Sequence, residues 1–536
     1  MANDLTLDKT ALRTEPDHET TGWPPGVPYI VGNEACERFS YYGMQSILQV
    51  HFTALFVAQG MTSDAAGDEA KSSIHLFKAG VYAFPMIGAI VADRLIGKYL
   101  TIFWVSLLYC AGHAVLAVGD GSLTGMFLGL GLIAVGSGGI KPCVSANVGD
   151  QFGRGNRSKI ETVYQIFYFS INFGSFFATI MIPWLYSAYG AGVAFGLPGV
   201  LMGIATFIFW LGRRNFVHAP PKPGGRLGVL DVGVAVCLFT AFASYLFFEK
   251  FLPWWGHLAI FVGGLGSGLA LFDLRQKTAA DDGFLSVMIH TCRAWVSGKA
   301  TRGAGFFGPA RARFDEATID GPRSVLRVVS VFALVSVFWA LFDQHHTSWI
   351  QQAGQMDLWI GSDRGILLKS SQIASLNPML IMLLLPFAKF LLYPGFEKLG
   401  LPLTPLRRMT VGLAFTSLSF VAIWFVQKAI DSGAPGSVHV AWQAIPYVLI
   451  TLGEVMVSVT GLEFAYTQAP KRMKSTIMGF WLLTVTLGNK LVALITLANR
   501  GMSLADSFVL YAVLCAIAAA LFGLRAYFYV GKDQTA

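Results

Sequence analysis

The sequence predicts an all-α protein that crosses a membrane many times. Of its 536 residues, 54% are hydrophobic and only 13% are charged, and the mean hydropathy is +0.56. Soluble proteins carry about 25% charged residues, so roughly half of the usual charge is missing. The hydrophobic residues recur in runs of about 20, the length that a helix needs to cross a bilayer. This composition excludes a soluble enzyme, a disordered chain, a disulfide scaffold and a coiled coil.

Fourteen such runs follow one another along the chain. We expect spans at residues 27–57, 73–97, 100–119, 122–146, 160–187, 194–213, 227–249, 254–274, 324–350, 366–394, 406–429, 440–467, 474–498 and 504–530. They form a group of six, a pair and a second group of six. A Pro- and Gly-rich piece at 219–225 precedes the pair, and a polar stretch at about 275–322 follows it.

Two six-helix halves around a linker indicate the major facilitator architecture, with a substrate site between the halves. The expected parts are a cytoplasmic tail at 1–21, a first bundle at 22–216, a linker with the extra helix pair (about 227–274) at 217–322, and a second bundle at 323–531. The string from Gly88 to Lys98 is similar to the loop motif of this architecture, in which Asp93 and Arg94 pin the helix ends. The alternative is an ordinary charged turn.

The basic residues indicate the orientation. Alternate loops hold fifteen Lys and Arg residues, whereas the opposite loops and span ends hold seven at most, Lys71 and Lys78 among them. The richer set faces the cytoplasm by the positive-inside rule, and both termini then lie there too. The net charge of +8 does not predict a nucleic-acid partner, because the basic residues sit in short loops rather than in one patch.

Several charged residues fall within predicted spans, where insertion is costly and a functional reason is expected. Glu34, Glu37 and Arg38 are spaced i, i+3 and i+4 on one helical face and carry a net charge of −1 when ionised. A proton or another cation would neutralise this surplus. The alternative is a buried ion pair beside a carboxylate that stays protonated.

Further polar residues are found in other spans. Lys141 follows a Gly-rich stretch and precedes Pro142, Trp339 and Asp343 are spaced i, i+4, and so are Glu454 and Ser458. A base in the first half and acids in the second predict ion pairs that open and close during alternating access. His75 and Tyr82 share a face, so His75 is either a proton sensor or a satisfied hydrogen-bonding group. No metal site is expected at His345 and His346.

Six ordered blocks resemble the proton-coupled oligopeptide transporter family, and the extra pair resembles its bacterial branch. The stretch 34–43 is similar to the family signature ExxERFxYYG. The other matching blocks are 139–145, 167–175, 338–344, 453–464 with 468–470, and 481–483.

The resemblance implies roles for individual residues. Glu34, Glu37, Arg38, His75, Asp343 and Glu454 would couple transport to protons. The substrate-binding positions would be Tyr41, Tyr42, Gln45, Tyr82, Lys141, Asn172, Trp339, Asn377, Glu454, Ser458 and Trp481. Lys141 and Asn172 would meet the carboxylate side of a peptide, Glu454 would meet its amino terminus, and Lys141 would also pair with Glu454.

One position departs from the family pattern. Gln45 stands where the family usually has an arginine that pairs with the acid at Asp343. Glutamine cannot neutralise a carboxylate, so we expect Asp343 to lack a built-in cation and His75 to supply one.

The sequence therefore predicts a symporter that imports di- and tripeptides with protons by alternating access. The alternatives are a proton-coupled carrier of nitrate or another small metabolite, and a peptide-sensing membrane receptor. We expect no enzymatic activity, no cofactor and no metal, with protons as the coupling ion. The expected setting is a bacterial inner membrane, where a monomer functions and the stretch 275–322 contacts anionic lipid.

Overall fold

The computed structural model describes residues 12–247, 252–280, 283–298, 305–361, 365–400, 403–468, 474–498 and 501–529. Thirteen helices among these residues are long and apolar enough to cross a membrane. Helix α1 (Val27–Ala58) is long enough at 32 residues but too polar to count with them. With α1 included, the helices match the fourteen predicted spans one to one. Residues 1–11 of the predicted tail, and Ala469 and Pro470 of the last motifs, lie outside the described residues.

The chain divides into two compact units, and each is described by itself. Unit 1 comprises residues 1–42, 84–175 and 191–275, and unit 2 comprises 43–83, 176–190 and 276–536. Helices α1 and α6 (Ile160–Tyr189) therefore contribute residues to both units, as does α9 (Trp254–Thr278) by its last three residues. The bundle boundaries predicted in sequence order stay a prediction.

Unit 1 is built from helices that approach closely at glycine. Its remaining elements are α3 (Pro85–Val91), the π-helix η1 (Ala92–Ile96), α4 (Lys98–Val118), α5 (Leu123–Asp150), η2 (Arg157–Lys159), α7 (Ala191–Leu211), η3 (Gly212–Arg214), α8 (Gly225–Phe247) and α9 (Trp254–Thr278). A Cβ added to Gly88 on α3 would lie 2.6 Å from the Cα of Gly139 on α5. The Gly-rich part of α5, just before Lys141, thus packs directly on α3.

The extra pair, α8 and α9, is attached to the motif loop of unit 1. The Asp231 carboxylate on α8 lies 2.9 Å from Arg275 Nε and 3.5 Å from Arg94 Nη1 of η1. The backbone N–H of Gly224 donates to the Arg94 carbonyl at 3.2 Å, and Gly228 leaves no room for a Cβ beside that carbonyl. The predicted motif residue Arg94 therefore holds the extra pair.

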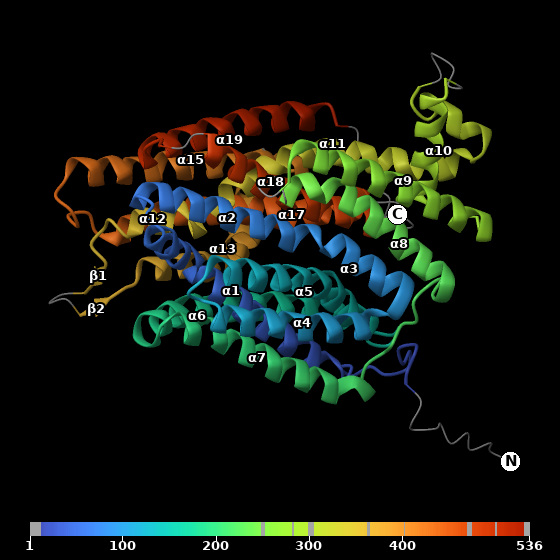
Figure 1. Cartoon of the computed structure of the whole chain (residues 1–536), viewed down its shortest axis with the longest axis horizontal. Coiled ribbons are helices and arrows are strands. Elements are labelled where there is room, and N and C mark those ends of the chain that lie inside the picture. The colour runs from blue at the N-terminus through green and yellow to red at the C-terminus, as the bar shows by residue number, and fades with distance from the viewer. Residues whose placement is uncertain are drawn as a thin grey trace. The chain divides into compact units, whose positions relative to one another are not determined.

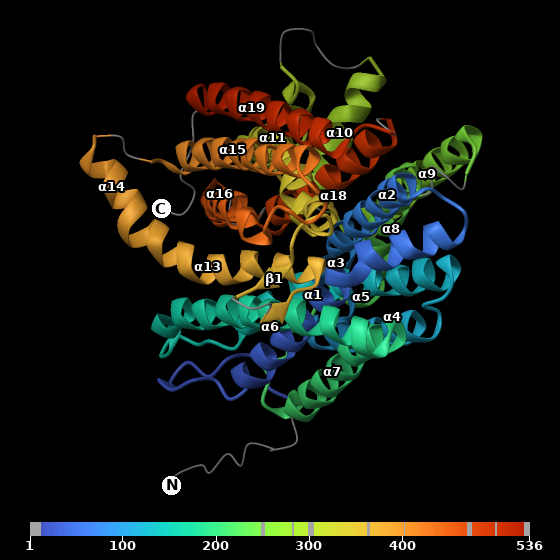
Figure 2. The same cartoon turned by 90° about the vertical axis from the view of Figure 1, so that its left-hand side faces the viewer.

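Unit 2 has a continuous apolar core formed by α11, α15, α16, α18 and α19. Figures 1 and 2 both show α15 beside α19, and α2 packs along α18. Its elements are α2 (Ser63–Ala83), α10 (Phe284–Val296), η4 (Gly308–Ala312), α11 (Glu316–Phe342), η5 (Asp343–His346), α12 (Ser348–Ala353), η7 (Ser370–Ser375), α13 (Leu376–Phe387), η8 (Ala388–Leu392), α14 (Tyr393–Lys398), α15 (Pro405–Ser432), η9 (Val440–Gln443), α16 (Ala444–Glu454), η10 (Val455–Val459), α17 (Thr460–Gln468), α18 (Lys474–Ala498) and α19 (Leu504–Tyr527).

Local signals explain several helix ends. Asp315 accepts a hydrogen bond from the Thr318 N–H at 2.8 Å and caps α11, and the Ser503 hydroxyl caps α19 in the same way. A small antiparallel sheet, β1 (Trp359–Ile360) with β2 (Ile366–Leu367), occupies the start of the span predicted at 366. That span begins later, at η7, because residues 366–367 pair as a strand.

Candidate functional site

The charged face of α1 forms a compact cluster in unit 1. Arg38 Nε lies 2.6 Å from Glu34 Oε1 and 3.2 Å from Glu37 Oε2. Both carboxylates are buried, at 1% and 0% exposure. The Ser137 hydroxyl of α5 donates to Glu37 Oε1 at 3.3 Å. One guanidinium therefore serves two buried carboxylates.

Glu34 Oε2 is the oxygen of this cluster that is more open to a further bond. It is buried and has no hydrogen-bond partner among the described residues. Glu37 Oε2 also has no hydrogen-bond partner among the described residues, but it lies 3.2 Å from Arg38 Nε. A proton on Glu34 Oε2 would neutralise the surplus negative charge without displacing Arg38 from Oε1. The geometry fits a proton-binding site, and the coupling role of the three residues stays a prediction.

Lys141 and Tyr41 lie together beside this cluster. The Lys141 ammonium lies over the Tyr41 ring, 4.1 Å from its centroid, and the Tyr42 ring contacts Tyr41 edge-on at 5.3 Å. A cation over an aromatic face is attracted by the ring. Asn172 on α6 is 5% exposed, and its amide donates to the carbonyl of Tyr168 at 2.9 Å. Unit 1 thus brings a cation and aromatic walls together.

Unit 2 holds the acid predicted to meet the amino group of a peptide. The Asn377 amide on α13 donates to Glu454 Oε2 at 2.8 Å and to Thr451 at 3.2 Å. Glu454 ends α16, and the π-helix η10 that follows contains Ser458. Single π turns inside α-helices are frequent at functional sites. The ion pair predicted between Lys141 and Glu454 joins one residue of each unit and stays a prediction.

Two tryptophans of unit 2 pack against each other. The rings of Trp339 on α11 and Trp481 on α18 meet edge-on, with centroids 6.2 Å apart. Gly461 makes room for Trp481, because a Cβ at this position would collide with the indole ring. The Trp339 indole nitrogen is buried without a hydrogen-bond partner in the described part of the chain. Tyr82 is half-buried on α2, and Gln45 is buried on α1.

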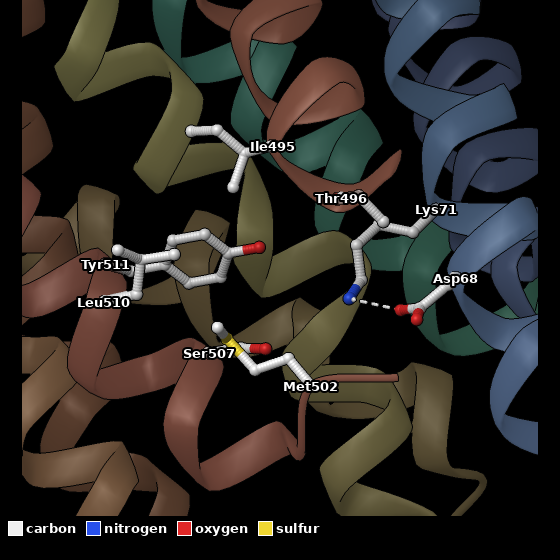
Figure 3. Close-up of a pocket in the computed structure, with 8 residues that line it drawn as sticks. All are labelled: Asp68, Lys71, Ile495, Thr496, Met502, Ser507, Leu510 and Tyr511. Atoms are coloured by element: carbon white, nitrogen blue, oxygen red, sulfur yellow. Dashed lines mark hydrogen bonds and ion pairs between the residues drawn. The ribbon is translucent and has the colours of Figure 1, made fainter. Parts of the chain in front are cut away.

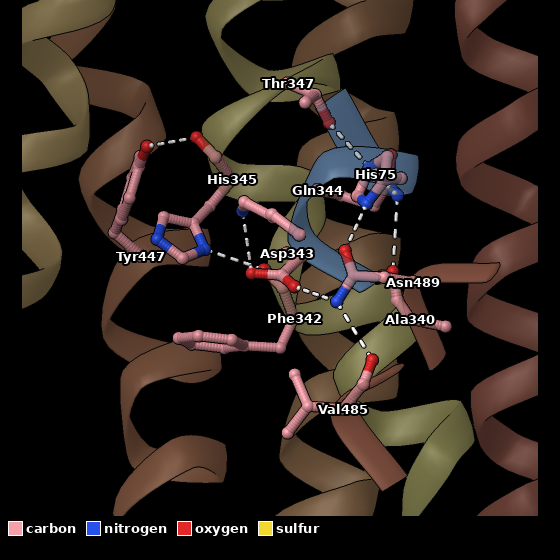
Figure 4. Close-up of polar contacts among 11 residues, drawn as sticks. His75, Ala340, Phe342, Asp343, Gln344, His345, Thr347, Tyr447, Val485 and Asn489 are labelled. Atoms are coloured by element: carbon pink, nitrogen blue, oxygen red, sulfur yellow. Dashed lines mark hydrogen bonds and ion pairs between the residues drawn. The ribbon is translucent and has the colours of Figure 1, made fainter. Parts of the chain in front are cut away.

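The expectation that Asp343 lacks a built-in cation is wrong. The Lys78 ammonium on α2 lies 2.9 Å from Asp343 Oδ1. His75 is linked to Asp343 through Asn489, whose amide contacts both residues at 2.7 Å (Figure 4). Lys78 therefore neutralises Asp343 in place of the arginine that is missing at Gln45, and a charged His75 is not required for this.

Sequence reasoning missed Lys78, Asn489 and Ser137. The loop pattern groups Lys78 with the basic residues of loops and span ends, although it lies three residues after His75 within a predicted span. That spacing on one helical face is the available signal. Asn489 and Ser137 give no comparable signal, because small polar residues are common in membrane helices.

A small, partly open pocket lies elsewhere in unit 2. Figure 3 shows its lining, in which Lys71 pairs with Asp68 at 3.3 Å. The other lining residues are Ile495, Thr496, Met502, Ser507, Leu510 and Tyr511. None of these is a predicted substrate-binding residue.

Several known proteins resemble this chain in sequence and fold. The POT family model matches residues 99–506. A crystal structure of an auto-inhibited POT family peptide transporter is 38% identical, with a TM-score of 0.77, and the alignment covers 96% of this chain and 99% of that chain. The POT family transporter PepTSo is 39% identical, with a TM-score of 0.76, over 94% of this chain and 98% of that chain. These likenesses confirm the predicted major facilitator fold.

Curated relatives from animals are also similar. Peptide transporter family 1 of Drosophila melanogaster is 32% identical over 414 residues, which is 74% of this chain and 47% of the relative. Solute carrier family 15 member 1 of Homo sapiens is 31% identical over 444 residues, which is 78% of this chain and 54% of the relative. The matched part thus spans about half the length of these two proteins. Family model, solved structures and relatives agree that this multi-pass membrane protein belongs to the POT family.

Proposed function

We propose that the protein imports di- and tripeptides together with protons by alternating access. The observation that carries this proposal is the α1 cluster, in which Arg38 serves the buried carboxylates of Glu34 and Glu37. Its surplus negative charge gives a proton a binding place within the bilayer. The relatives named above are peptide transporters, which supports the same reading.

The substrate is proposed from the charges in the two units. Lys141 binds the carboxylate side of the peptide with Asn172, and Glu454 binds its amino terminus. Every di- or tripeptide carries these two charges whatever its side chains are. The tyrosines at 41, 42 and 82 and the tryptophans at 339 and 481 supply apolar walls, which suit a broad range of side chains. Gln45, Asn377 and Ser458 complete the proposed pocket.

Two alternatives fit these residues less well. Nitrate offers no positive group for Glu454, and a receptor without net transport does not need titratable groups in both units. The family is one of transporters, and we propose that the protein has no enzymatic activity and uses no cofactor other than the proton. We also propose a bacterial inner membrane, cytoplasmic termini, a functional monomer, and contact of the stretch 275–322 with anionic lipid.

The direct test is uptake of labelled dialanine by the full chain in liposomes, with and without an inward proton gradient. We expect the gradient to accelerate uptake and to drive accumulation. A dialanine that is acetylated at one end and amidated at the other should compete at least about tenfold more weakly, because it has lost both charges. Gradient-independent uptake, or equal competition by the blocked peptide, would contradict the proposal.

A further inference from the structure

Six polar residues of unit 2 form one connected group, here called the Asp343 cluster. Its members come from α2, η5, the residue after η5 and α18: His75, Lys78, Asp343, Gln344, Thr347 and Asn489. Figure 4 shows the contacts that join His75, Gln344, Thr347 and Asn489 around the carboxylate of Asp343. Of this group, the family resemblance assigns a proton-coupling role only to His75 and Asp343.

Both carboxylate oxygens of Asp343 have donors. Lys78 Nζ lies 2.9 Å from Oδ1, and Asn489 Nδ2 donates to Oδ2 at 2.7 Å. Lys78 is 1% exposed and Asp343 is 8% exposed. A buried ion without a partner is strongly disfavoured, so each of these two charges depends on the other.

The hydrogen bonds also determine which nitrogen of His75 carries the proton. Asn489 Nδ2 donates to Asp343 and to the carbonyl of Val485, so its Oδ1 is the atom that faces His75 Nδ1 at 2.7 Å. An amide oxygen only accepts, and His75 Nδ1 must therefore be the donor.

The second ring nitrogen meets a donor. Gln344 Nε2 donates to the carbonyl of Ala340 at 3.2 Å, and its Oε1 accepts from the Ser348 hydroxyl at 2.6 Å. The Gln344 NH2 group is therefore the part that faces His75 Nε2, at 3.3 Å. An imidazole nitrogen that accepts a hydrogen bond carries no proton. His75 is neutral in this arrangement.

The charges of the cluster then balance, with one cation at Lys78 and one anion at Asp343. The neighbouring groups that interact electrostatically with these residues are Lys71 on α2, His345 and His346 on η5, and Glu454 at the end of α16. A proton from solution that bonds to His75 Nε2 makes an imidazolium and leaves the cluster with a surplus of +1. Thr347 Oγ1, 3.4 Å away, can accept the new N–H, whereas the Gln344 amide must turn.

We propose that Lys78 is a proton-coupling residue, the resident counter-ion of Asp343, and that a proton on His75 competes with it for this carboxylate through Asn489. The inference rests on the proposed function. It adds Lys78 to the proton-coupling residues, whereas the sequence pattern groups Lys78 with the basic residues of loops and span ends. Two cations cannot both be neutralised by one carboxylate, so protonation weakens the contact between α2 and η5.

The test compares dialanine uptake against pH in liposomes for wild type and for variants of the full chain. Lys78→Gln should lower gradient-driven uptake by about tenfold or more and move the remaining uptake to higher pH, because no resident cation then opposes the proton. Lys78→Arg keeps the charge and should keep the pH profile. The double variant Lys78→Gln with Asp343→Asn removes both ions, so neither is left buried without a partner. It should fold, exchange peptide in counterflow and lose the part of the pH dependence that His75 causes.

Lys71→Gln is the matched control. Lys71 is also a buried lysine on α2, 3% exposed, but it pairs with Asp68 of its own helix. Lys71 acts on His75 more weakly than Lys78 does, so its variant should shift the pH profile much less than Lys78→Gln. If wild type transports dialanine but Lys78→Gln or the double variant keeps the wild-type profile, this inference fails alone. If wild type shows no gradient-driven uptake, the proposed function fails and this inference with it.

Discussion

At the scale of single residues, the α1 cluster sets one cation against two anions. Arg38 contacts both Glu34 and Glu37, and neither carboxylate is more than 1% exposed. A surplus charge in such a place is disfavoured unless a proton or another cation balances it. Proton binding and the position of Arg38 are therefore linked.

Glu37→Gln or Arg38→Gln should abolish gradient-driven uptake. Glu37→Gln removes the surplus negative charge that binds the proton, and Arg38→Gln removes the cation that pairs with both carboxylates. Peptide counterflow, which needs no net proton movement, should survive in Glu37→Gln. Ser137→Ala is the control, since it removes only one hydroxyl bond of about 0.5–1.5 kcal/mol and should leave coupling in place. Undiminished gradient-driven uptake in the Glu37 or Arg38 variant would contradict the proton-coupling role of these residues.

Lys141→Ala should weaken dipeptide binding by about ten- to a hundredfold, the factor expected for one lost charge-assisted hydrogen bond. Lys141→Arg keeps the charge but replaces a compact ammonium by a planar fork above the Tyr41 ring, so it should restore part of the affinity. Calorimetric titration with dialanine measures both. Equal binding by the alanine variant and wild type would show that Lys141 is outside the pocket.

The α1 cluster could be predicted from the sequence, whereas the ion pair of the Asp343 cluster could not. Glu34, Glu37 and Arg38 belong to one helical turn, and their spacing alone places them together. The contact of Lys78 with Asp343 joins positions 265 residues apart, which no local pattern reveals. The glutamine at position 45 shows that the usual arginine is absent. Only the packing of α2 in unit 2 shows that Lys78 pairs with Asp343 instead.

At the scale of elements, glycines decide which side chains fit between helices. Gly461 on α17 faces the Trp481 ring, whereas a Cβ added to Gly32 on α1 would have nothing within 4 Å. Alanine favours a helix over glycine by about 1 kcal/mol, so the two positions should respond in opposite directions.

Gly461→Ala should displace the Trp481 ring, lower the Tm and raise the KM for dialanine, because Trp481 is a proposed pocket wall. Gly32→Ala should leave the KM unchanged and the Tm equal or slightly higher. Fluorescence-detected unfolding and concentration-dependent uptake measure these effects. A Gly461→Ala protein with wild-type Tm and KM would mean that the helices shift freely to accept the methyl group.

The extra helix pair offers a second prediction. Asp231→Asn removes the carboxylate shared by Arg94 and Arg275 and should destabilise the α8 attachment by about 2 kcal/mol, between the values for exposed and buried pairs. Faster proteolysis of the 218–224 connection and a lower Tm are the expected readouts. Glu316→Gln breaks ion pairs with Arg311 and Arg323, but its own carboxylate is more than half exposed, so the change should lower the Tm less than Asp231→Asn does. Equal effects of the two variants would contradict a structural role for Asp231.

The membrane spans were easier to predict than their exact starts and the π-helices within them. The apolar runs located all fourteen, but α2 begins at Ser63 rather than at 73, because its first turns carry Asp64, Asp68 and Glu69 and continue the helix as a polar segment. The π-helices η1, η8 and η10 lie inside apolar runs that are typical of regular helix. Hydropathy reports burial in lipid and contains no information on such local changes of hydrogen bonding.

At the scale of the whole molecule, the proton gradient sets how far peptide can be concentrated. About one pH unit with about 100 mV supplies about 3.7 kcal/mol per proton, enough for an accumulation of about 500-fold with one proton per neutral peptide. Composition and six motifs were sufficient for the fold, since the likeness to a solved POT family transporter covers 96% of this chain.

Peptide-driven proton movement tests proton coupling without relying on an imposed gradient. Liposomes that hold the full chain and a trapped pH-sensitive dye are given dialanine outside, at equal pH on both sides. Inward peptide flow should acidify the interior at a rate that saturates with dialanine, and Glu37→Gln should abolish the signal while it retains peptide exchange. Dialanine entry without acidification in wild type would contradict proton-coupled transport.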